Sequence, residues 1–230
     1  MASSVRANRA APGVWRRFPL IGKAFAAGVA CSALVVMSAC SDPPLDDRAV
    51  PPEHIFADSL IVSVEDVRHI ANFEGLQPYS YADRHHPLAS INAPGPCQAV
   101  GSSNLTFTSG WKEYRAVTYS GTTDDLRPGG IAPINEVSHA VAIYPDSGAA
   151  RGALAQLESR LNQCASLHDN AYDFALSKPD PMTLRLGSAG WSHFYRTKSS
   201  VLMSVGVLGI EPTEQVATTV LQTITDRIKQ

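Results

Sequence analysis

Charged side chains are scarce in this sequence, at 17% of 230 residues, and no cluster of basic residues occurs after Lys23. Proteins that bind nucleic acid need clustered lysine and arginine to neutralise phosphates, so we expect no nucleic-acid partner. The sequence also lacks G-x-S-x-G, H-E-x-x-H and G-x-x-x-x-G-K. These patterns are typical of serine hydrolases, zinc peptidases and P-loop nucleotide-binding proteins. Their absence predicts a protein that is not an enzyme and needs no cofactor.

A hydrophobic run long enough to cross a membrane is missing as well. A spanning helix needs roughly 20 apolar residues, and the run AFAAGVACSALVVM at residues 24–37 is shorter. Five basic residues and no acidic residue precede this run. A basic segment followed by a short apolar one predicts a secretory signal peptide over residues 1–39, with an uncleaved signal anchor as the alternative. Cleavage removes the five bases and lowers the net charge from −2 to −7.

A cysteine follows the apolar run directly. The segment MSAC, which ends at Cys40, resembles the bacterial lipobox, with Met37 in place of the commoner leucine. The resemblance implies that Cys40 is lipidated and becomes the N-terminus, and two or three acyl chains suffice to hold a protein on a membrane. We therefore expect a protein on the extracytoplasmic face of the cell membrane. Residues 40–58, which are polar and rich in proline, form a lipidated tether, and residues 59–230 form the folded domain.

The sequence has only four cysteines. Cys31 leaves with the signal peptide and Cys40 carries lipid, so Cys97 and Cys164 remain. Two remaining thiols in an exported protein usually pair, and we expect a disulfide between them, with two buried free thiols as the alternative. A metal site needs more ligands than these two cysteines or the loop pair His85-His86 provide, and no metal is expected.

Hydrophobic periodicity predicts an α+β fold: a single disulfide-stabilised domain with a mainly antiparallel β-sheet packed with helices. Helices are expected at residues 63–71, where Ser63 and Asp66 form a capping box, at 145–164 and at 211–230. The strand candidates are the segments 105–111, 113–121, 136–145, 172–176, 182–186, 191–197 and 201–209, which are rich in β-branched and aromatic residues.

Aromatic residues on or beside the expected strands are candidates for a binding pocket, because their rings form apolar walls with polar edges. With one histidine, the candidates are Trp111, Tyr114, His139, Tyr144, Trp191 and Tyr195. The alternative is that they are ordinary core side chains. For His139, which stands among apolar strand residues, a structural role is favoured over that of a catalytic base.

Two stretches carry a resemblance to a known family: PCQAVGSSNLTFTSGWKEYRAV at residues 96–117 and HAVAIYPDSGAARGALAQLESRLNQC at 139–164. Preceded by a helix that opens on Ser-x-x-Asp, they resemble the PknH-like extracellular domain, the sensor domain of a mycobacterial Ser/Thr kinase that also occurs in stand-alone lipoproteins. The resemblance covers residues 58–229. It implies a disulfide-stabilised α/β sandwich-like domain with a cleft for an unidentified ligand. Cys97 and Cys164 match one of two family disulfides, and the second pair has no counterpart here.

These observations favour a membrane-anchored sensor or binding lipoprotein that takes a small or lipidic envelope ligand without catalysis. The alternative is an interaction module that docks on another protein of the cell envelope. A large cleft would favour the first function, and a flat exposed apolar patch the second. A hydrolase is the least favoured function, because it needs a hydrogen-bonded Ser-His-acid cluster in a cleft.

Overall fold

The computed structural model describes residues 54–89, 93, 95–123 and 133–229. The expected signal peptide, Cys40 and most of the expected tether lie outside these ranges. The described residues from 54 onward belong to one compact unit, and the two hydrophobic clusters found among them are built from residues between 57 and 228. A chain that begins at Ser41 therefore contains the complete core and is expected to fold by itself.

The described residues form one seven-stranded sheet in which every neighbouring pair is antiparallel, in the order β1-β2-β3-β7-β6-β5-β4. The strands are β1 (Gln77–Pro78), β2 (Glu113–Thr122), β3 (Ile134–Ile143), β4 (Ala175–Asp180), β5 (Thr183–Ser188), β6 (Trp191–Lys198) and β7 (Val201–Leu208). The central strand β7 is buried along almost its whole length, as its nearly continuous apolar sequence predicts.

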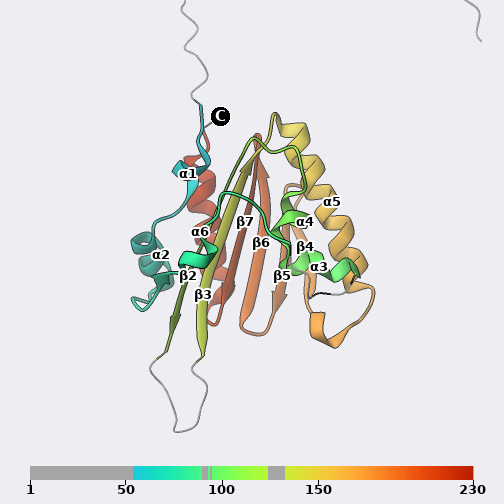
Figure 1. Cartoon of the computed structure of the whole chain (residues 1–230). Coiled ribbons are helices and arrows are strands. Elements are labelled where there is room, and N and C mark those ends of the chain that lie inside the picture. The colour runs from blue at the N-terminus through green and yellow to red at the C-terminus, as the bar shows by residue number, and fades with distance from the viewer. Residues whose placement is uncertain (1–53, 90–92, 94, 124–132, 230) are drawn as a thin grey trace, which may run out of the picture. The chain divides into compact units, whose positions relative to one another are not determined.

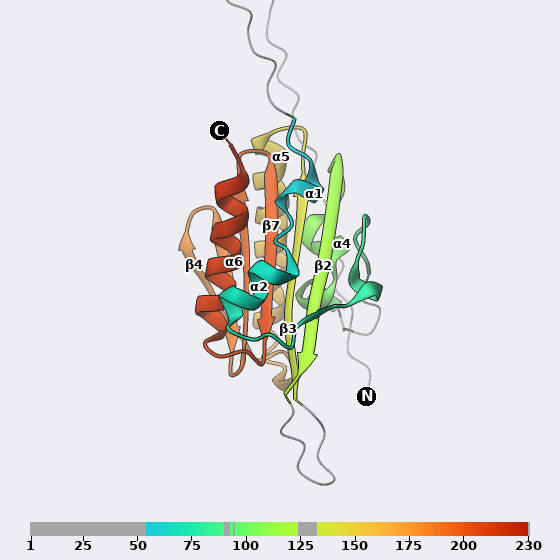
Figure 2. The same cartoon turned by 90° about the vertical axis from the view of Figure 1, so that its left-hand side faces the viewer.

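Helices cover both faces of this sheet. Figure 2 shows α1 (Ala57–Leu60), α2 (Val64–Ala71) and α6 (Thr213–Arg227) in front of β2, β3 and β7. Side chains that alternate along β7, such as Val201 and Met203, join this helical layer in the first hydrophobic cluster. The side chain of Ser63 accepts a hydrogen bond from the backbone N–H of Asp66, so the N-cap expected for this helix is present.

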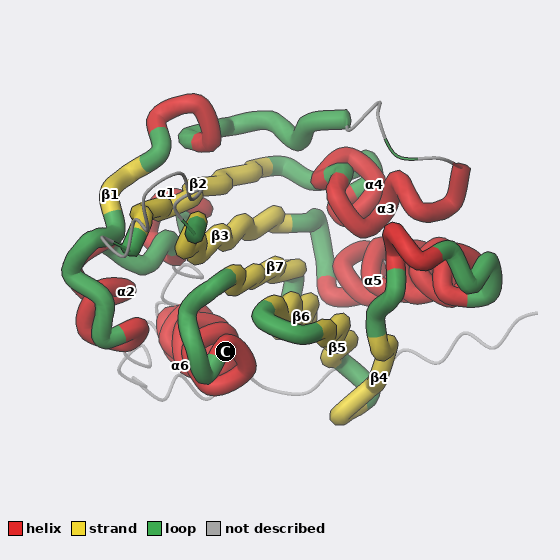
Figure 3. Tube along the Cα trace, turned by 90° about the horizontal axis from the view of Figure 1, so that it is seen from below, coloured by secondary structure: helices red, strands yellow, loops and turns green. Residues whose placement is uncertain are grey.

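The opposite face carries α3 (Gln98–Gly101), α4 (Ser103–Phe107) and α5 (Ser147–Ala165). Figure 3 shows these helices on one side of the row of strands and α6 with α2 on the other. The N-cap of the long helix α5 is Asp146, whose carboxylate accepts a hydrogen bond from the backbone N–H of Ala149 over 2.8 Å. Its buried stripe, which includes Leu154, Leu157 and Leu161, packs in the second cluster. The sheet with helices on both faces (Figure 1) confirms the expected α+β class.

Two of the expected strands differ from the observed structure. Residues 105–111 do not form a strand, because Ser103–Phe107 is the helix α4. The apolar, β-branched sequence there is typical of a strand, but Phe107 is fully buried against α5 and the sheet, and Arg160 of α5 donates to the carbonyl of Leu105 over 2.7 Å. Tertiary packing thus overrides local β propensity. The fourth strand begins only at Ala175, after a 3-10 turn at Asn170–Tyr172.

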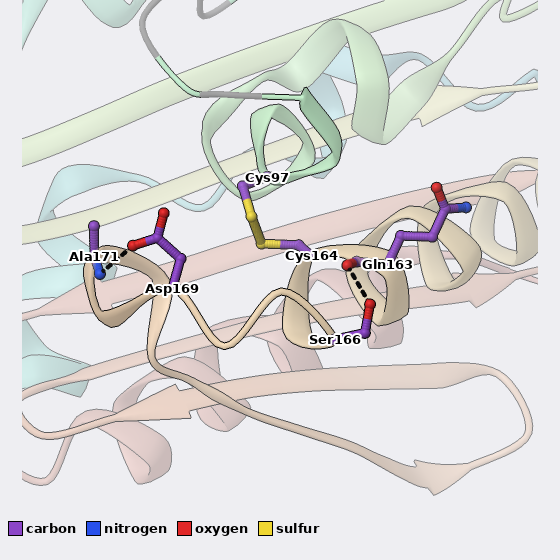
Figure 4. Close-up of a disulfide and its surroundings, with 6 residues drawn as sticks. All are labelled: Cys97, Gln163, Cys164, Ser166, Asp169 and Ala171. Carbon is purple, nitrogen blue, oxygen red and sulfur yellow. Dashed lines mark hydrogen bonds between the residues drawn. A yellow bond between two sulfur atoms is a disulfide. The ribbon is translucent and has the colours of Figure 1, made fainter. Parts of the chain in front are cut away.

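The disulfide expected from the sequence joins Cys97 to Cys164 (Figure 4). Cys97 ends the 3-10 helix Gly95–Cys97, just before α3, and Cys164 lies in the last turn of α5. The two Cα atoms are 4.7 Å apart, and both residues are buried. The bond therefore fastens the start of the α3–α4 segment to the C-terminal end of α5.

Candidate functional site

A cleft of about 390 Å³ opens on the same face of the sheet as α5, over the part of that face that α5 does not cover. The inner faces of β2, β3, β7 and β6 form its floor. One wall is α3 with α4, and the other is the segment 82–88, in which the backbone of Arg84 pairs with that of Ala116 in β2. This volume lies within the range of about 300–1,000 Å³ typical of small-molecule sites.

Three of the tyrosines singled out from the sequence hold α4 in place. Tyr114 of β2, Tyr144 after β3 and Tyr195 of β6 are 4%, 3% and 1% exposed. The hydroxyl of Tyr144 donates to the carbonyl of Phe107. The hydroxyls of Tyr114 and Tyr195 lie near the side chains of Ser103 and Thr106, which moderate the rise in their pKa values. Burial raises the pKa of Tyr144 to about 12 and also raises the pKa of the other two. These neutral hydroxyls position a wall of the cleft, while Tyr114 and Tyr195 also line it.

The two tryptophans have different positions. Trp111 packs beside Tyr114, with ring centroids 5.8 Å apart, but does not line the cleft. Trp191, the first residue of β6, is partly exposed and lines the cleft near His193, with ring centroids 6.0 Å apart. Trp191 is therefore the candidate that presents an aromatic ring to a ligand.

His139 supports the opposite side of the sheet. His139 borders the cleft, but because side chains alternate along a strand its ring points to the other face of the sheet. There Nε2 accepts a hydrogen bond from the backbone N–H of Val62 over 3.1 Å. The hydroxyl of Tyr119 donates to the carbonyl of Val62 over 2.7 Å. Burial lowers the pKa of His139 to about 3, so the ring is neutral and acts as a fixed acceptor.

The centre of the floor is polar, and sequence reasoning missed its residues. Ser138 of β3, Gly206 of β7 and His193 of β6 lie side by side in the sheet register. Glu136 lies two residues before Ser138 on β3, and Ser204 lies two residues before Gly206 on β7, so both side chains are on the same face of the sheet as these neighbours. A signal was present in the alternation: β7 places Val201, Met203, Val205 and Val207 on one face, and Leu202, Ser204, Gly206 and Leu208 on the other. A polar or absent side chain at two successive inward positions indicates an open floor rather than packed core.

Two titratable groups of the floor are perturbed in different directions. Nε2 of His193 is 2.7 Å from Oγ of Ser204, and burial lowers the pKa of this histidine to about 4. Burial raises the pKa of Glu136. Within the described ranges, no hydrogen bond or ion pair reaches the carboxylate of Glu136. The floor thus holds a neutral imidazole and a partly buried acid whose hydrogen-bonding capacity is unused.

The pair His193–Ser204 has the nucleophile-to-base distance of a hydrolase, yet the rest of a triad is not assembled. Among the described residues, no carboxylate hydrogen-bonds to Nδ1 of His193. The arrangement suits a binding site that offers donors and acceptors to a ligand.

The described part of the chain offers neither a cluster of metal ligands nor a membrane-spanning helix. No group of three or more His, Cys, Asp or Glu side chains there is placed to hold an ion. His85 and His86 lie in an exposed turn. No helix within the described ranges is both long and apolar enough to cross a membrane.

Comparison with known proteins agrees with this fold. A family model described as "PknH-like extracellular domain" matches residues 56–227. Among solved structures, the chain is similar to one described as "Crystal structure of the extracellular domain of PknH from Mycobacterium tuberculosis", with 18% sequence identity and a TM-score of 0.51. That similarity covers 74% of this chain and 93% of the other, and it shows a shared fold. No curated protein matches the chain.

Proposed function

The chain belongs to the family of PknH-like extracellular domains, and we propose that it is a lipid-anchored, non-catalytic sensor lipoprotein whose cleft binds a small or lipidic ligand of the cell envelope. The observation that carries this proposal is the cleft itself. Its floor combines polar side chains with the partly exposed ring of Trp191, and it has the volume of a small-molecule site.

The place where the domain joins its tether lies away from the polar floor of the cleft. The backbone N–H of Ala57 donates to Glu113 over 2.9 Å, and Glu113 pairs with Ile143 at the end of β3. The tether therefore joins the domain where β3 ends. The floor residues Glu136 and Ser138 lie in the first half of β3, nearer the opposite end of the sheet.

Tether length is compatible with a domain held clear of lipid. Residues 40–53 precede the described domain, and fourteen residues span at most about 50 Å when extended. In this arrangement the lipid on Cys40 sets the location, and the cleft samples the aqueous side of the envelope.

Native mass spectrometry of the chain beginning at Ser41, purified from its native host, tests the binding function. We expect a bound small molecule at one copy per chain, released on denaturation. The variant Gly206→Leu, which places a large side chain on the cleft floor, is expected to emerge at the bare chain mass. A wild-type domain that is always empty contradicts ligand binding.

A second candidate function has one specific observation in its favour. Tyr79 and Tyr81 are 50% and 75% exposed, with ring centroids 5.7 Å apart. Adjacent exposed tyrosines are typical of protein interfaces. Copurification of a stoichiometric envelope protein that is lost in Tyr81→Ala, together with an empty cleft, would assign the chain to docking on a protein partner instead.

Cys40→Ala tests the lipid anchor. We expect the variant to remain unprocessed or to leave the membrane fraction, because no thiol remains to accept the acyl chains that hold the protein on lipid. Cys31→Ala, nine residues before Cys40 and inside the same expected signal peptide, is the matched control and should behave as wild type. Cell fractionation with metabolic labelling by a fatty acid measures both. Unchanged labelling and membrane retention of Cys40→Ala would contradict lipidation at this residue.

A further inference from the structure

The polar floor has a hydrogen-bonding capacity that the described residues do not use. Glu136 has no partner among them, although it is partly buried. Nδ1 of His193 likewise makes no hydrogen bond to another described residue. Solvent reaches these groups in the open cleft, but a ligand that displaces the solvent without replacing its hydrogen bonds leaves them unpaired at a cost. A ligand that fits this floor must therefore supply hydrogen-bond donors to the carboxylate.

A notch between two strands shows what kind of group fits. A Cβ atom on Gly206 would lie 2.8 Å from Nδ1 of His193 and 2.9 Å from Oγ of Ser138. Because glycine has no side chain, these two polar atoms face the same part of the cleft above Gly206, and no side chain of this residue separates them from a ligand. A neutral imidazole has one donor and one acceptor nitrogen, and a serine hydroxyl both donates and accepts. A ligand hydroxyl, which also does both, satisfies this pair in either tautomer.

Charge and apolar surface narrow the ligand class. The charged residues that line the cleft are one cation, Arg84, and one acid, Glu136, so the cleft has no excess of positive charge for a phosphate or sulfate. A plain acyl chain would leave Glu136, Ser138 and His193 unpaired. The ring of Trp191 stands at the edge of this polar group and offers an apolar face.

We propose that the cleft binds a neutral carbohydrate, with one sugar ring packed on Trp191, a hydroxyl in the notch above Gly206 and further hydroxyls donating to Glu136. A sugar ring presents a face of C–H groups and a rim of hydroxyls, which matches the aromatic and polar parts of the floor. The sugar is either free, as a saccharide or glycan end, or the headgroup of a glycolipid. This inference rests on the proposed binding function and specifies its ligand.

The experiment uses the chain from Ser41 with Trp111→Phe. The signal peptide carries the third tryptophan of the sequence, so Trp191 is then the remaining tryptophan fluorophore. The probes are the methyl glycosides of glucose, galactose, mannose and arabinose, octyl glucoside below its micelle concentration, and laurate as an acyl chain without a sugar. We expect a saturable change in Trp191 fluorescence with at least one methyl glycoside at millimolar concentration.

Three floor variants and one control make the test specific. Glu136→Gln, Ser138→Ala and Gly206→Ala are expected to weaken sugar binding, the first by at least about tenfold, since hydrogen bonds to a charged group are the stronger ones. Gly152→Ala is the matched glycine control, because it lies on the exposed side of α5 with open space where its Cβ would be. It should bind as wild type. Ser138→Ala adds no bulk and keeps the test valid if Gly206→Ala disturbs the strand.

The outcomes separate the two proposals. Tighter binding of octyl glucoside than of methyl glucoside by more than about tenfold assigns a glycolipid headgroup, and equal binding assigns a free or polymeric glycan. Saturable binding of laurate without any sugar, abolished by Gly206→Ala, overturns the carbohydrate inference and leaves the binding function standing. No response to any sugar, or sugar binding that ignores all three floor variants, also overturns it. Native mass spectrometry then judges the binding function separately.

Discussion

Replacing both Cys97 and Cys164 by alanine is expected to lower the free energy of unfolding by about 4 kcal/mol. The disulfide closes a loop of 67 residues, and the chain-entropy account assigns about this value to a loop of that length. For a domain of this size the melting temperature should fall by about 8–16 °C. Urea denaturation of the chain from Ser41 measures the change.

The same double variant should affect the two helices of the cleft wall differently. α3 follows Cys97 directly and should lose protection from hydrogen exchange. α4 is held independently by hydrogen bonds from Tyr144 and Arg160, so its amides should remain protected. Reduced wild-type protein is the control, because it loses the covalent link while keeping both sulfur atoms in the core. Equal loss of protection in α3 and α4 would show that the disulfide, and not the tyrosines, positions the whole wall.

Hydrophobic periodicity was sufficient for the fold class and for the long elements. The helix α5 and the strand β3 have repeating apolar positions over ten or more residues, and such patterns report local structure well. The short helix α4 could not be predicted in this way. Its residues have strand propensity, and their helical conformation depends on contacts with α5 and with tyrosines far away in the sequence.

The binding cleft was only partly predictable for a related reason. Aromatic residues are recognisable in a sequence as pocket candidates, and Tyr114, Trp191 and Tyr195 line the cleft. The residues that define its chemistry are smaller. The notch exists because Ser138, Gly206 and His193 lie next to each other on three strands, and their adjacency depends on strand order and register. A glycine in a strand gives no indication from sequence of which neighbours border the space that it leaves.

Acid is expected to destabilise the domain through His139. A histidine has an ordinary pKa near 6.5, and burial lowers that of His139 to about 3. Below pH 6.5 the unfolded chain therefore binds a proton that the folded chain excludes. The contribution of neutral His139 to the free energy of unfolding is fully present above this pH. It falls as the pH decreases towards 3, by at most about 1.4 kcal/mol per pH unit. Nearby Arg227 and Arg115 oppose protonation as well.

His139→Gln tests this origin, because its amide oxygen can still accept the hydrogen bond from Val62 but cannot titrate. We expect urea denaturation to show that His139→Gln loses less stability than wild type between about pH 7 and about pH 4. His193, whose pKa is lowered to about 4, retains its own contribution in both proteins. His69→Gln, at an exposed position of α2, is the control and should follow wild type. If His139→Gln loses stability as steeply as wild type, the exclusion of a proton from His139 does not cause the loss of stability in acid. The segment between α1 and α2 is then held by hydrogen bonds from Tyr119 and Arg227 rather than by the imidazole.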